Sequence, residues 1–283
     1  MRELKLSCAD STFPKLSHDG SLTVIADLGF PAVDVCSFTG YRHTPPEQVL
    51  ADPDRAADVV IERLERFGLA VSDMFVILGS SFEEQAPNHP DERVREKALD
   101  DYQRFVTFAR LIGSPGITVL PGTEFDGVPE GESMELAAEQ LNVRAQLAGE
   151  AGLRLAFEPH FGSLAQTPAK ALELIERTHD VRFALDYSHF VYQGIDQDEV
   201  DLLLPHTHHF HVRQAAPGVV QARTREGTID FARVRDELLG MGYEGYFALE
   251  YQWEDGWLDF SRVDCIAETA EMRDLLLNKG DAS

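Results

Sequence analysis

The chain has 283 residues, of which 43% are hydrophobic, and this composition can bury a full core in the size range of closed α/β barrels. Its 25 basic and 49 acidic residues give a formal net charge of −24, which repels nucleic acid and anionic membrane surfaces. We therefore expect a small or weakly charged partner, and neither nucleic acid nor membrane.

Short apolar stretches with the length of buried strands recur from one end of the sequence to the other. They predict eight strands, over residues 4–10, 32–38, 69–78, 116–121, 153–160, 181–187, 208–214 and 245–251. The intervals between them carry apolar residues at helical spacing, and we expect eight helices.

The first helix is expected over residues 16–29, although His18-Asp19-Gly20 interrupts its pattern. The second, third, fourth and seventh helices have the clearest spacing, in Ala57 to Phe67, Tyr102 to Ala109, Met134 to Ala148 and Phe231 to Met241. Glycine is expected to end several helices, and Asp or Thr to cap their first turns, at Gly68, Gly113, Gly152, Gly242, Thr167 and Asp230.

Strict alternation of strand and helix requires parallel strands joined by right-handed crossovers. Eight such units favour a closed barrel over an open sheet, so we predict a single (β/α)₈ TIM barrel domain over residues 1–283. No Gly-rich phosphate loop follows the first strand, which removes the main open-sheet competitor. Residues 80–91 and 122–131 form long loops that would lie over the active-site mouth.

The sequence has no recognisable targeting or anchoring segment. Residues 1–7 lack the long apolar stretch of a secretion signal, and no later segment approaches the ~20 apolar residues of a membrane span, so we expect a cytoplasmic protein. The three cysteines, Cys8, Cys36 and Cys265, are widely separated and are interpreted as small buried side chains.

Four of the predicted strands end on groups that are costly to bury without a charge partner, namely Glu158, Asp186, His211 and Glu250. In three of them the order is alanine, a large apolar residue and then the acid. Because strand side chains alternate, each acid lies on the same face as its alanine, pointing into the barrel.

The carboxyl ends of the strands meet at one mouth of a barrel, so these four side chains should converge there. Three carboxylates and one imidazole suit a single divalent metal ion. We expect Mn²⁺, and Mg²⁺, Co²⁺ or Zn²⁺ suit the same donors. The like charge of three buried carboxylates is tolerable only if a cation binds or a proton is taken up.

The order of Glu158, Asp186-x-x-His189, His211 and Glu250 on strands five to eight resembles the xylose-isomerase-like TIM barrel superfamily over nearly the whole chain. That superfamily includes sugar isomerases, ketose 3-epimerases, inosose dehydratases, hydroxypyruvate isomerases and endonuclease IV. The resemblance implies that the four strand-end residues bind the metal and that His189 contacts a substrate oxygen. It also implies a homo-oligomer.

The chemistry of these residues fits proton abstraction next to a carbonyl group. Glu158 and Glu250 would flank the reacting carbon, one removing the proton and the other returning it. Return on the opposite face gives epimerisation, return to the adjacent carbon gives isomerisation, and loss of a β-hydroxyl gives dehydration. These outcomes need nearly the same ligands, so the ligands do not choose among them.

Further residues near the strand ends are candidates for substrate contact. His160 lies two residues beyond Glu158, and Arg213 has the same relation to His211. The ketose epimerases carry an arginine several residues after the strand-seven histidine, where this chain has Pro217, so Arg213 or Arg223 would substitute.

Several other side chains can be interpreted either as substrate contacts or as structural residues. Trp253 and Trp257 fit either a wall that stacks on a sugar ring or packing under a loop. His43 and Glu124 have the right location for substrate contact, but we interpret both as solvated loop side chains. His209, one layer deeper than His211, is interpreted as a hydrogen-bonded core histidine.

The first functional hypothesis is a metal-dependent isomerase or epimerase of an unphosphorylated keto or aldo sugar or polyol. The alternative is a lyase: an inosose or dehydro-acid dehydratase, or a catalytic subunit that cleaves an oxidised glycoside. Endonuclease IV activity is disfavoured, because strand three ends without a histidine, no Asp-x-His follows His211, and the chain is acidic. A barrel that binds sugar without turnover is disfavoured by the two intact glutamates.

Overall fold

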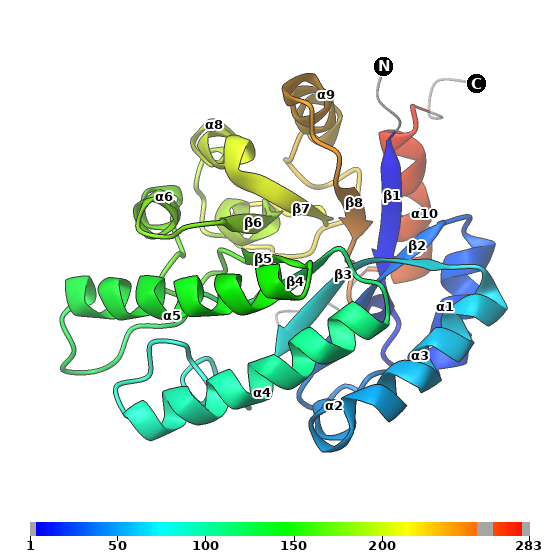
Figure 1. Ribbon diagram of the computed structural model, residues 1–283. Helices are drawn as coiled ribbons and strands as arrows, with labels where there is room; N and C mark the ends of the chain where they lie inside the picture. Colours follow the sequence, from blue (N-terminus) through cyan, green and yellow to red (C-terminus); the bar gives the residue numbers. More distant parts are fainter. Residues whose placement is uncertain (1–3, 254–262, 279–283) are drawn as a thin grey trace.

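The eight predicted strands form a closed parallel barrel in sequence order, with β1 hydrogen-bonded to β8, in the computed structural model, which describes residues 4–253 and 263–278. Figure 1 shows the helices arranged around these strands. The strands are β1 (Lys5–Ala9), β2 (Ala32–Phe38), β3 (Ala70–Ile77), β4 (Gly116–Val119), β5 (Arg154–Phe157), β6 (Val181–Asp186), β7 (Thr207–Val212) and β8 (Tyr246–Leu249). The predicted (β/α)₈ barrel is confirmed.

Amphipathic helices cover the outside of the barrel. The principal ones are α1 (His18–Asp27), α3 (Pro53–Phe67), α4 (Glu92–Leu111), α5 (Glu130–Glu150), α6 (Pro168–Glu176), α9 (Phe231–Met241) and α10 (Cys265–Leu276). The predicted caps are confirmed: Thr167 and Asp230 accept hydrogen bonds from backbone N–H groups of α6 and α9. Gly68 and Gly242 end α3 and α9 in the left-handed conformation.

Three crossovers depart from the prediction. The first helix begins at His18, because the side chain of Ser17 caps it, and Gly20 lies within its first turn. Between β2 and β3 a short helix, α2 (Pro46–Ala51), precedes α3, because Asp52 adopts an extended conformation and caps α3. Between β6 and β7 three short helices replace a single one, namely α7 (Ser188–Tyr192), α8 (Gln197–Val200) and the 3₁₀ helix η2 (Asp201–His206).

The core divides into an outer apolar layer and a barrel interior of small and polar side chains. Phe157, Leu185 and Leu249 are fully buried between the strands and the helices, while Ala156, Ala184 and Ala248 are fully buried on the opposite face. The barrel interior also holds buried polar side chains: Ser7, Asp34, Ser72, Asp73, Thr118 and His209. The three cysteines are buried and free, as expected.

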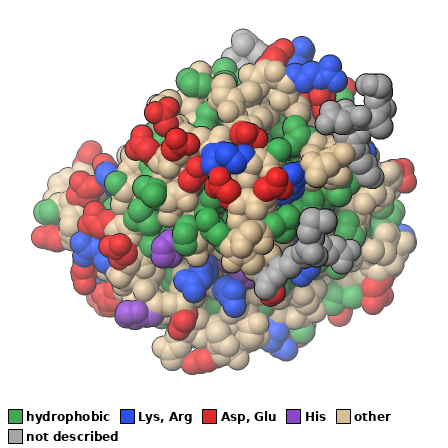
Figure 2. Space-filling model, turned by 90° about the horizontal axis from the view of Figure 1, so that it is seen from above, with side chains coloured by type: hydrophobic (Ala, Val, Ile, Leu, Met, Phe, Trp, Pro, Cys, Tyr) green, Lys and Arg blue, Asp and Glu red, His purple; other side chains and the backbone are tan. Residues whose placement is uncertain are grey.

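The surface carries the excess of acidic residues. Figure 2 views the molecule from above the view of Figure 1, and Asp and Glu side chains are scattered over this face with Lys and Arg among them. Within the described ranges, no helix has both the length and the apolar character needed to cross a membrane.

Candidate functional site

A cavity of about 390 Å³ opens where several strands end. The size lies within the range of small-molecule sites. One part of its lining is aromatic and apolar, and another part is polar. The lining includes Phe38, Tyr41, Phe75 and Phe82 together with Glu158, His160, His189, Arg213, Glu250 and Gln252.

Glu158 and Glu250 line this cavity from two strands, and His211, from a third strand, lies against both of them. Glu158 follows the last residue of β5, His211 lies near the end of β7, and Glu250 follows β8. The Nδ1 atom of His211 lies 2.8 Å from Oε1 of Glu158 and 3.5 Å from Oε2 of Glu250. All three side chains are buried. Two carboxylates therefore face the same imidazole nitrogen.

Asp186 lies beside this group and forms an ion pair with Arg213. Its Oδ2 atom accepts a hydrogen bond from Nη2 of Arg213 at 2.7 Å, and its Oδ1 atom accepts one from the backbone N–H of Ser188, also at 2.7 Å. Arg213 also donates to the Ser188 hydroxyl at 2.9 Å and is itself buried. The strand-end aspartate therefore forms a buried ion pair next to the other three predicted ligands.

The two mouth histidines connect these parts. Nε2 of His189 lies 3.4 Å from Oε2 of Glu158 and 3.5 Å from Oδ2 of Asp186. The ring of His160 lies over His189, with 3.8 Å between the ring centroids, and its Nδ1 donates to the carbonyl oxygen of Phe161. Burial, followed by the neighbouring His189, lowers the pKa of His160 to about 3, which keeps this imidazole neutral.

The pKa values of the two glutamates shift in opposite directions. Burial raises the pKa of Glu250, although His211 and Arg213 oppose the rise. Burial also acts to raise the pKa of Glu158, but the charges and hydrogen bonds of His189 and His211 outweigh it and hold that pKa well below its usual range. The surroundings therefore favour the ionised form of Glu158 and make Glu250 the harder of the two glutamates to ionise.

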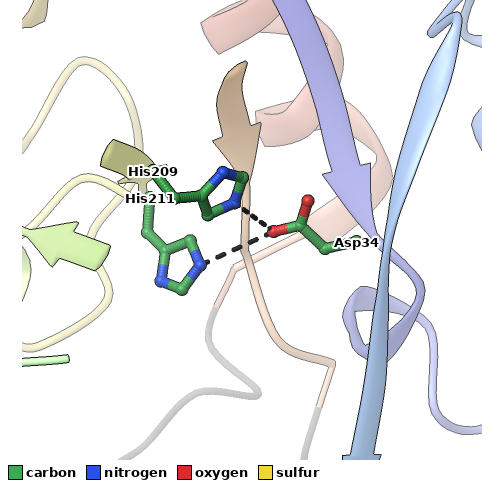
Figure 3. A group of neighbouring side chains, drawn as sticks. All are labelled: Asp34, His209 and His211. Atoms are coloured by element: carbon green, nitrogen blue, oxygen red, sulfur yellow. Dashed lines mark hydrogen bonds and ion pairs between the residues drawn. The ribbon is translucent and has the colours of Figure 1, made fainter. Parts of the chain in front are cut away.

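A second buried cluster lies deeper in the barrel, where Asp34 of β2 meets His209 and His211 of β7 (Figure 3). His209 is buried and its Nε2 lies 2.7 Å from Oδ2 of Asp34, as expected of a hydrogen-bonded core histidine. Sequence reasoning missed Asp34. The available signal was a lone carboxylate in the middle of the apolar stretch over residues 32–38, which requires a buried partner.

The remaining candidates lie away from the cluster of acids. The expectation for His43 is wrong: its side chain is buried, stacks on His18 with 5.0 Å between ring centroids, and contacts the carbonyl oxygen of Leu16. Glu124 is exposed and pairs with Lys170, as a solvated side chain should. Arg223 is exposed and lies 3.4 Å from Glu226.

Trp253 is half-buried against the hydrophobic core, with the ammonium group of Lys15 5.3 Å from its ring centroid. This location favours the packing interpretation. Trp257 lies outside the described residues.

The donor set of the mouth fits a divalent metal ion. Among the described residues, three groups of buried side chains have potential ligand atoms within 4.8 Å of one another, and one of them is Glu158, His211 and Glu250. The other two are Glu158, His160 and His189, and Asp34, His209 and His211. Carboxylate oxygens with an imidazole nitrogen are donors for Mn²⁺, Mg²⁺, Co²⁺ or Zn²⁺. Burying several carboxylates in one place is also costly unless a cation compensates part of their charge.

Solved structures of sugar epimerases have the same fold. D-psicose 3-epimerase from Clostridium cellulolyticum superposes with a TM-score of 0.78 at 16% sequence identity, covering 97% of this chain and 99% of that one. A 3-keto-D-glucoside 4-epimerase from E. coli superposes with a TM-score of 0.71 at 16% identity, covering 96% and 99%. At this level of identity the likeness concerns the fold alone.

Curated relatives share higher identity over a shorter length. The inosose dehydratase of Geobacillus thermodenitrificans is 28% identical over 142 residues, which is 42% of this chain and 47% of the relative. The inosose dehydratase of Klebsiella pneumoniae is 24% identical over 194 residues, or 55% and 64%. The match thus spans about half the length of the first relative.

The family-level match covers much more of the chain. The closed barrel, with acids and a histidine at the ends of consecutive strands, is the architecture that the sequence predicted. The model of the Xylose isomerase-like TIM barrel family matches residues 22–274, and the chain therefore belongs to that family.

Proposed function

We propose that the chain is a divalent-metal-dependent isomerase or epimerase that acts on an unphosphorylated keto or aldo sugar or polyol. The observation that carries this proposal is the convergence of two buried glutamates, Glu158 and Glu250, on the Nδ1 atom of His211 at the cavity. The sugar epimerases among its structural neighbours support the same class of reaction.

Four residues would hold the metal ion: Glu158, Asp186, His211 and Glu250. When bound, a divalent ion supplies Lewis-acid polarisation of a substrate carbonyl and its neighbouring hydroxyl. Mn²⁺ is the ion that we expect, with Mg²⁺, Co²⁺ or Zn²⁺ as alternatives for the same donors. Arg213 neutralises one of the three carboxylates, so the net charge left for an ion to balance is smaller than the ligand list alone suggests.

The two glutamates would move the proton. The ionised Glu158 is suited to accept a proton from the carbon next to the carbonyl, and Glu250, whose pKa is raised, is the better placed of the two to hold and return a proton. Donation on the opposite face of that carbon gives an epimer, and donation to the adjacent carbon gives an isomer. His189 and His160 line the same cavity and would contact substrate oxygens.

The lining of the cavity favours a neutral sugar. Phe38, Tyr41 and Phe75 offer apolar surface for the C–H face of a sugar, while the acids and histidines offer partners for its hydroxyl groups. Arg213 is the sole Lys or Arg among the described lining residues, and it is already paired with Asp186. A phosphate group would therefore meet carboxylates rather than available cations.

The cytoplasmic location and the homo-oligomer, which we expected from the sequence, remain predictions.

A second candidate is a lyase that removes water from an inosose or a dehydro acid. The inosose dehydratases among the curated relatives favour it. It would use the same proton abstraction at Glu158, followed by loss of a β-hydroxyl instead of return of the proton to carbon.

The test is an NMR screen of keto and aldo sugars, inososes and dehydro acids in D₂O with added Mn²⁺. An isomerase or epimerase introduces deuterium into a recovered sugar, whereas a lyase gives an unsaturated product and water. Glu158→Gln and Glu250→Gln should abolish product formation, and Glu124→Gln is the matched control that should remain active, because Glu124 is an exposed partner of Lys170. Turnover in either of the first two variants would refute the two-glutamate mechanism.

A further inference from the structure

The buried carboxylate of Asp34 lies behind His211, on the opposite side of the imidazole from the two glutamates. Nε2 of His211 lies 3.5 Å from Oδ2 of Asp34, whereas Nδ1 of His211 faces Glu158 and Glu250. Figure 3 shows both histidines of β7 directed at the same carboxylate oxygen. His211 is therefore held between the mouth of the cavity and a carboxylate of the barrel interior.

The oxygens of Asp34 are all occupied by donors. Its Oδ1 accepts from the hydroxyl groups of Ser7, at 3.3 Å, and Ser72, and its Oδ2 faces His209 at 2.7 Å and His211 at 3.5 Å. An ionised carboxylate accepts about four hydrogen bonds and donates none. His209 therefore donates its Nε2–H group to this carboxylate, and Nε2 of His211, 3.5 Å from the same oxygen, is placed to direct an N–H group at it.

The position of that proton decides which nitrogen of His211 can bind a metal ion. A nitrogen that binds a metal has to be free of its proton, and the hydrogen bond made by the other nitrogen fixes the tautomer. Without an ion, Nδ1 of His211 lies 2.8 Å from Oε1 of the ionised Glu158 and therefore carries a proton of its own. A metal ion that binds beside the two glutamates would displace this proton, whereas an N–H group at Nε2 that faces Asp34 would be kept. Asp34 would thereby favour the tautomer in which the lone pair of Nδ1 points at the ion.

We propose that Asp34 is a positioning residue for the metal site: it fixes the orientation and tautomer of His211, and His209 holds Asp34 in place for this role. The inference rests on the proposed function, because it assigns Asp34 to the site that would hold the divalent ion. Such hydrogen-bonded carboxylates behind a metal-binding histidine typically change metal affinity by about 10–100-fold when removed.

The same three side chains could instead hold a second ion, because their ligand atoms lie within 4.8 Å of one another. The hydrogen bonds argue for positioning. Ser7 and Ser72 already occupy Oδ1 of Asp34, and a second ion would need Nε2 of His211 while Nδ1 serves the first. The stoichiometry of metal binding separates these two arrangements.

The experiment measures Mn²⁺ binding to the purified full chain by calorimetry, alone and with Asp34→Asn, Asp34→Ala and Asp73→Asn. Asp73 is the matched control: it is the partner of Asp34 in the β2–β3 register, it is buried, and its Oδ2 accepts from the hydroxyl of Thr118 rather than from His211. We expect one Mn²⁺ per chain, an affinity about 10–100-fold weaker in Asp34→Asn and weaker again in Asp34→Ala, and no change in Asp73→Asn.

A second measurement needs no variant of Asp34. In the Mg²⁺-loaded, ¹⁵N-histidine-labelled chain, NMR should show His211 protonated at Nε2, with its signals assigned by their loss in His211→Gln. This keeps the inference testable if the Asp34 variants do not fold.

The outcomes are distinct. Wild-type affinity in the Asp34 variants, a second Mn²⁺ that those variants lose, or a metal-loaded His211 protonated at Nδ1 would each overturn the inference and leave the proposed function standing. A wild-type chain that binds no divalent ion would overturn the proposed function itself.

Discussion

Replacing Arg213 by methionine should strongly destabilise the metal-free protein. The guanidinium of Arg213 and the carboxylate of Asp186 are both buried, and their atoms lie 2.7 Å apart. Removing one partner of a buried ion pair leaves an uncompensated charge and costs about 3–5 kcal/mol of the free energy of unfolding. Methionine fills much of the space of the arginine stem, so most of this loss should come from the bare carboxylate.

Added Mn²⁺ should restore part of that stability, because a cation bound at the mouth would compensate Asp186 in place of the guanidinium. We expect Mn²⁺ to stabilise Arg213→Met by about 1.4 kcal/mol or more beyond its effect on wild type, which corresponds to tenfold tighter binding. Urea unfolding with and without Mn²⁺ measures both effects.

Arg144→Met is the matched control, since Arg144 is also buried but donates to the carbonyl and side-chain oxygens of Gln140 rather than to a carboxylate. The reasoning is refuted if Arg213→Met loses less than about 1 kcal/mol, far below the cost of a broken buried pair. It is also refuted if Mn²⁺ stabilises both arginine variants equally.

Three further outcomes follow from single features. Burial raises the pKa of Asp73 from an ordinary 3.8 to about 6, so its stabilising protonation is complete below pH 3.8 and is lost as the pH rises through 6. A difference of about 2 between the two pKa values corresponds to about 3 kcal/mol of the free energy of unfolding. Urea titrations should therefore show Asp73→Asn becoming more stable relative to wild type by about 3 kcal/mol between acidic and mildly alkaline pH. A difference in stability that does not change with pH would contradict this. Gly122 has φ +109°, and a Cβ there would collide with the side chain of Asn88, so Gly122→Ala should lower the free energy of unfolding by about 1–3 kcal/mol. Gly127 has a positive φ but open space around it, so Gly127→Ala should cost less. Equal losses in the two variants would exclude the collision. Removing the metal ion with a chelator should lower the melting temperature, because an ion present at a hundred times its Kd stabilises the folded protein by about 2.7 kcal/mol. Calorimetry that shows the same melting temperature with and without chelator would contradict a bound ion.

The sequence predicts the strand ends well because one repeating pattern determines them. An apolar stretch that ends on an acid gives both the strand and the direction of its last side chain, and Glu158 and Glu250 lie next to His211 at the cavity as that reasoning requires. Closure of the barrel follows from the number of strand and helix units, without any knowledge of side-chain partners.

The partners of buried charges are beyond this pattern. Asp34 and His209 are 175 residues apart in the chain and meet only because β2 and β7 face the same barrel interior. Arg213 was expected to contact substrate, and it lines the cavity, but its ion pair with Asp186 joins the ends of two strands, which the alternation within one strand does not predict. His43 lies in a loop that we expected to be exposed, yet its side chain is buried and stacks on the ring of His18.

The most direct test of the metal site is a crystal structure of the Mn²⁺-soaked chain, with anomalous diffraction used to locate the ion. The proposed function predicts one strong anomalous peak at the cavity, bound by Glu158, His211 and Glu250, with Asp186 turned toward it. A chain that shows no peak there, or a peak only at other side chains, would contradict it.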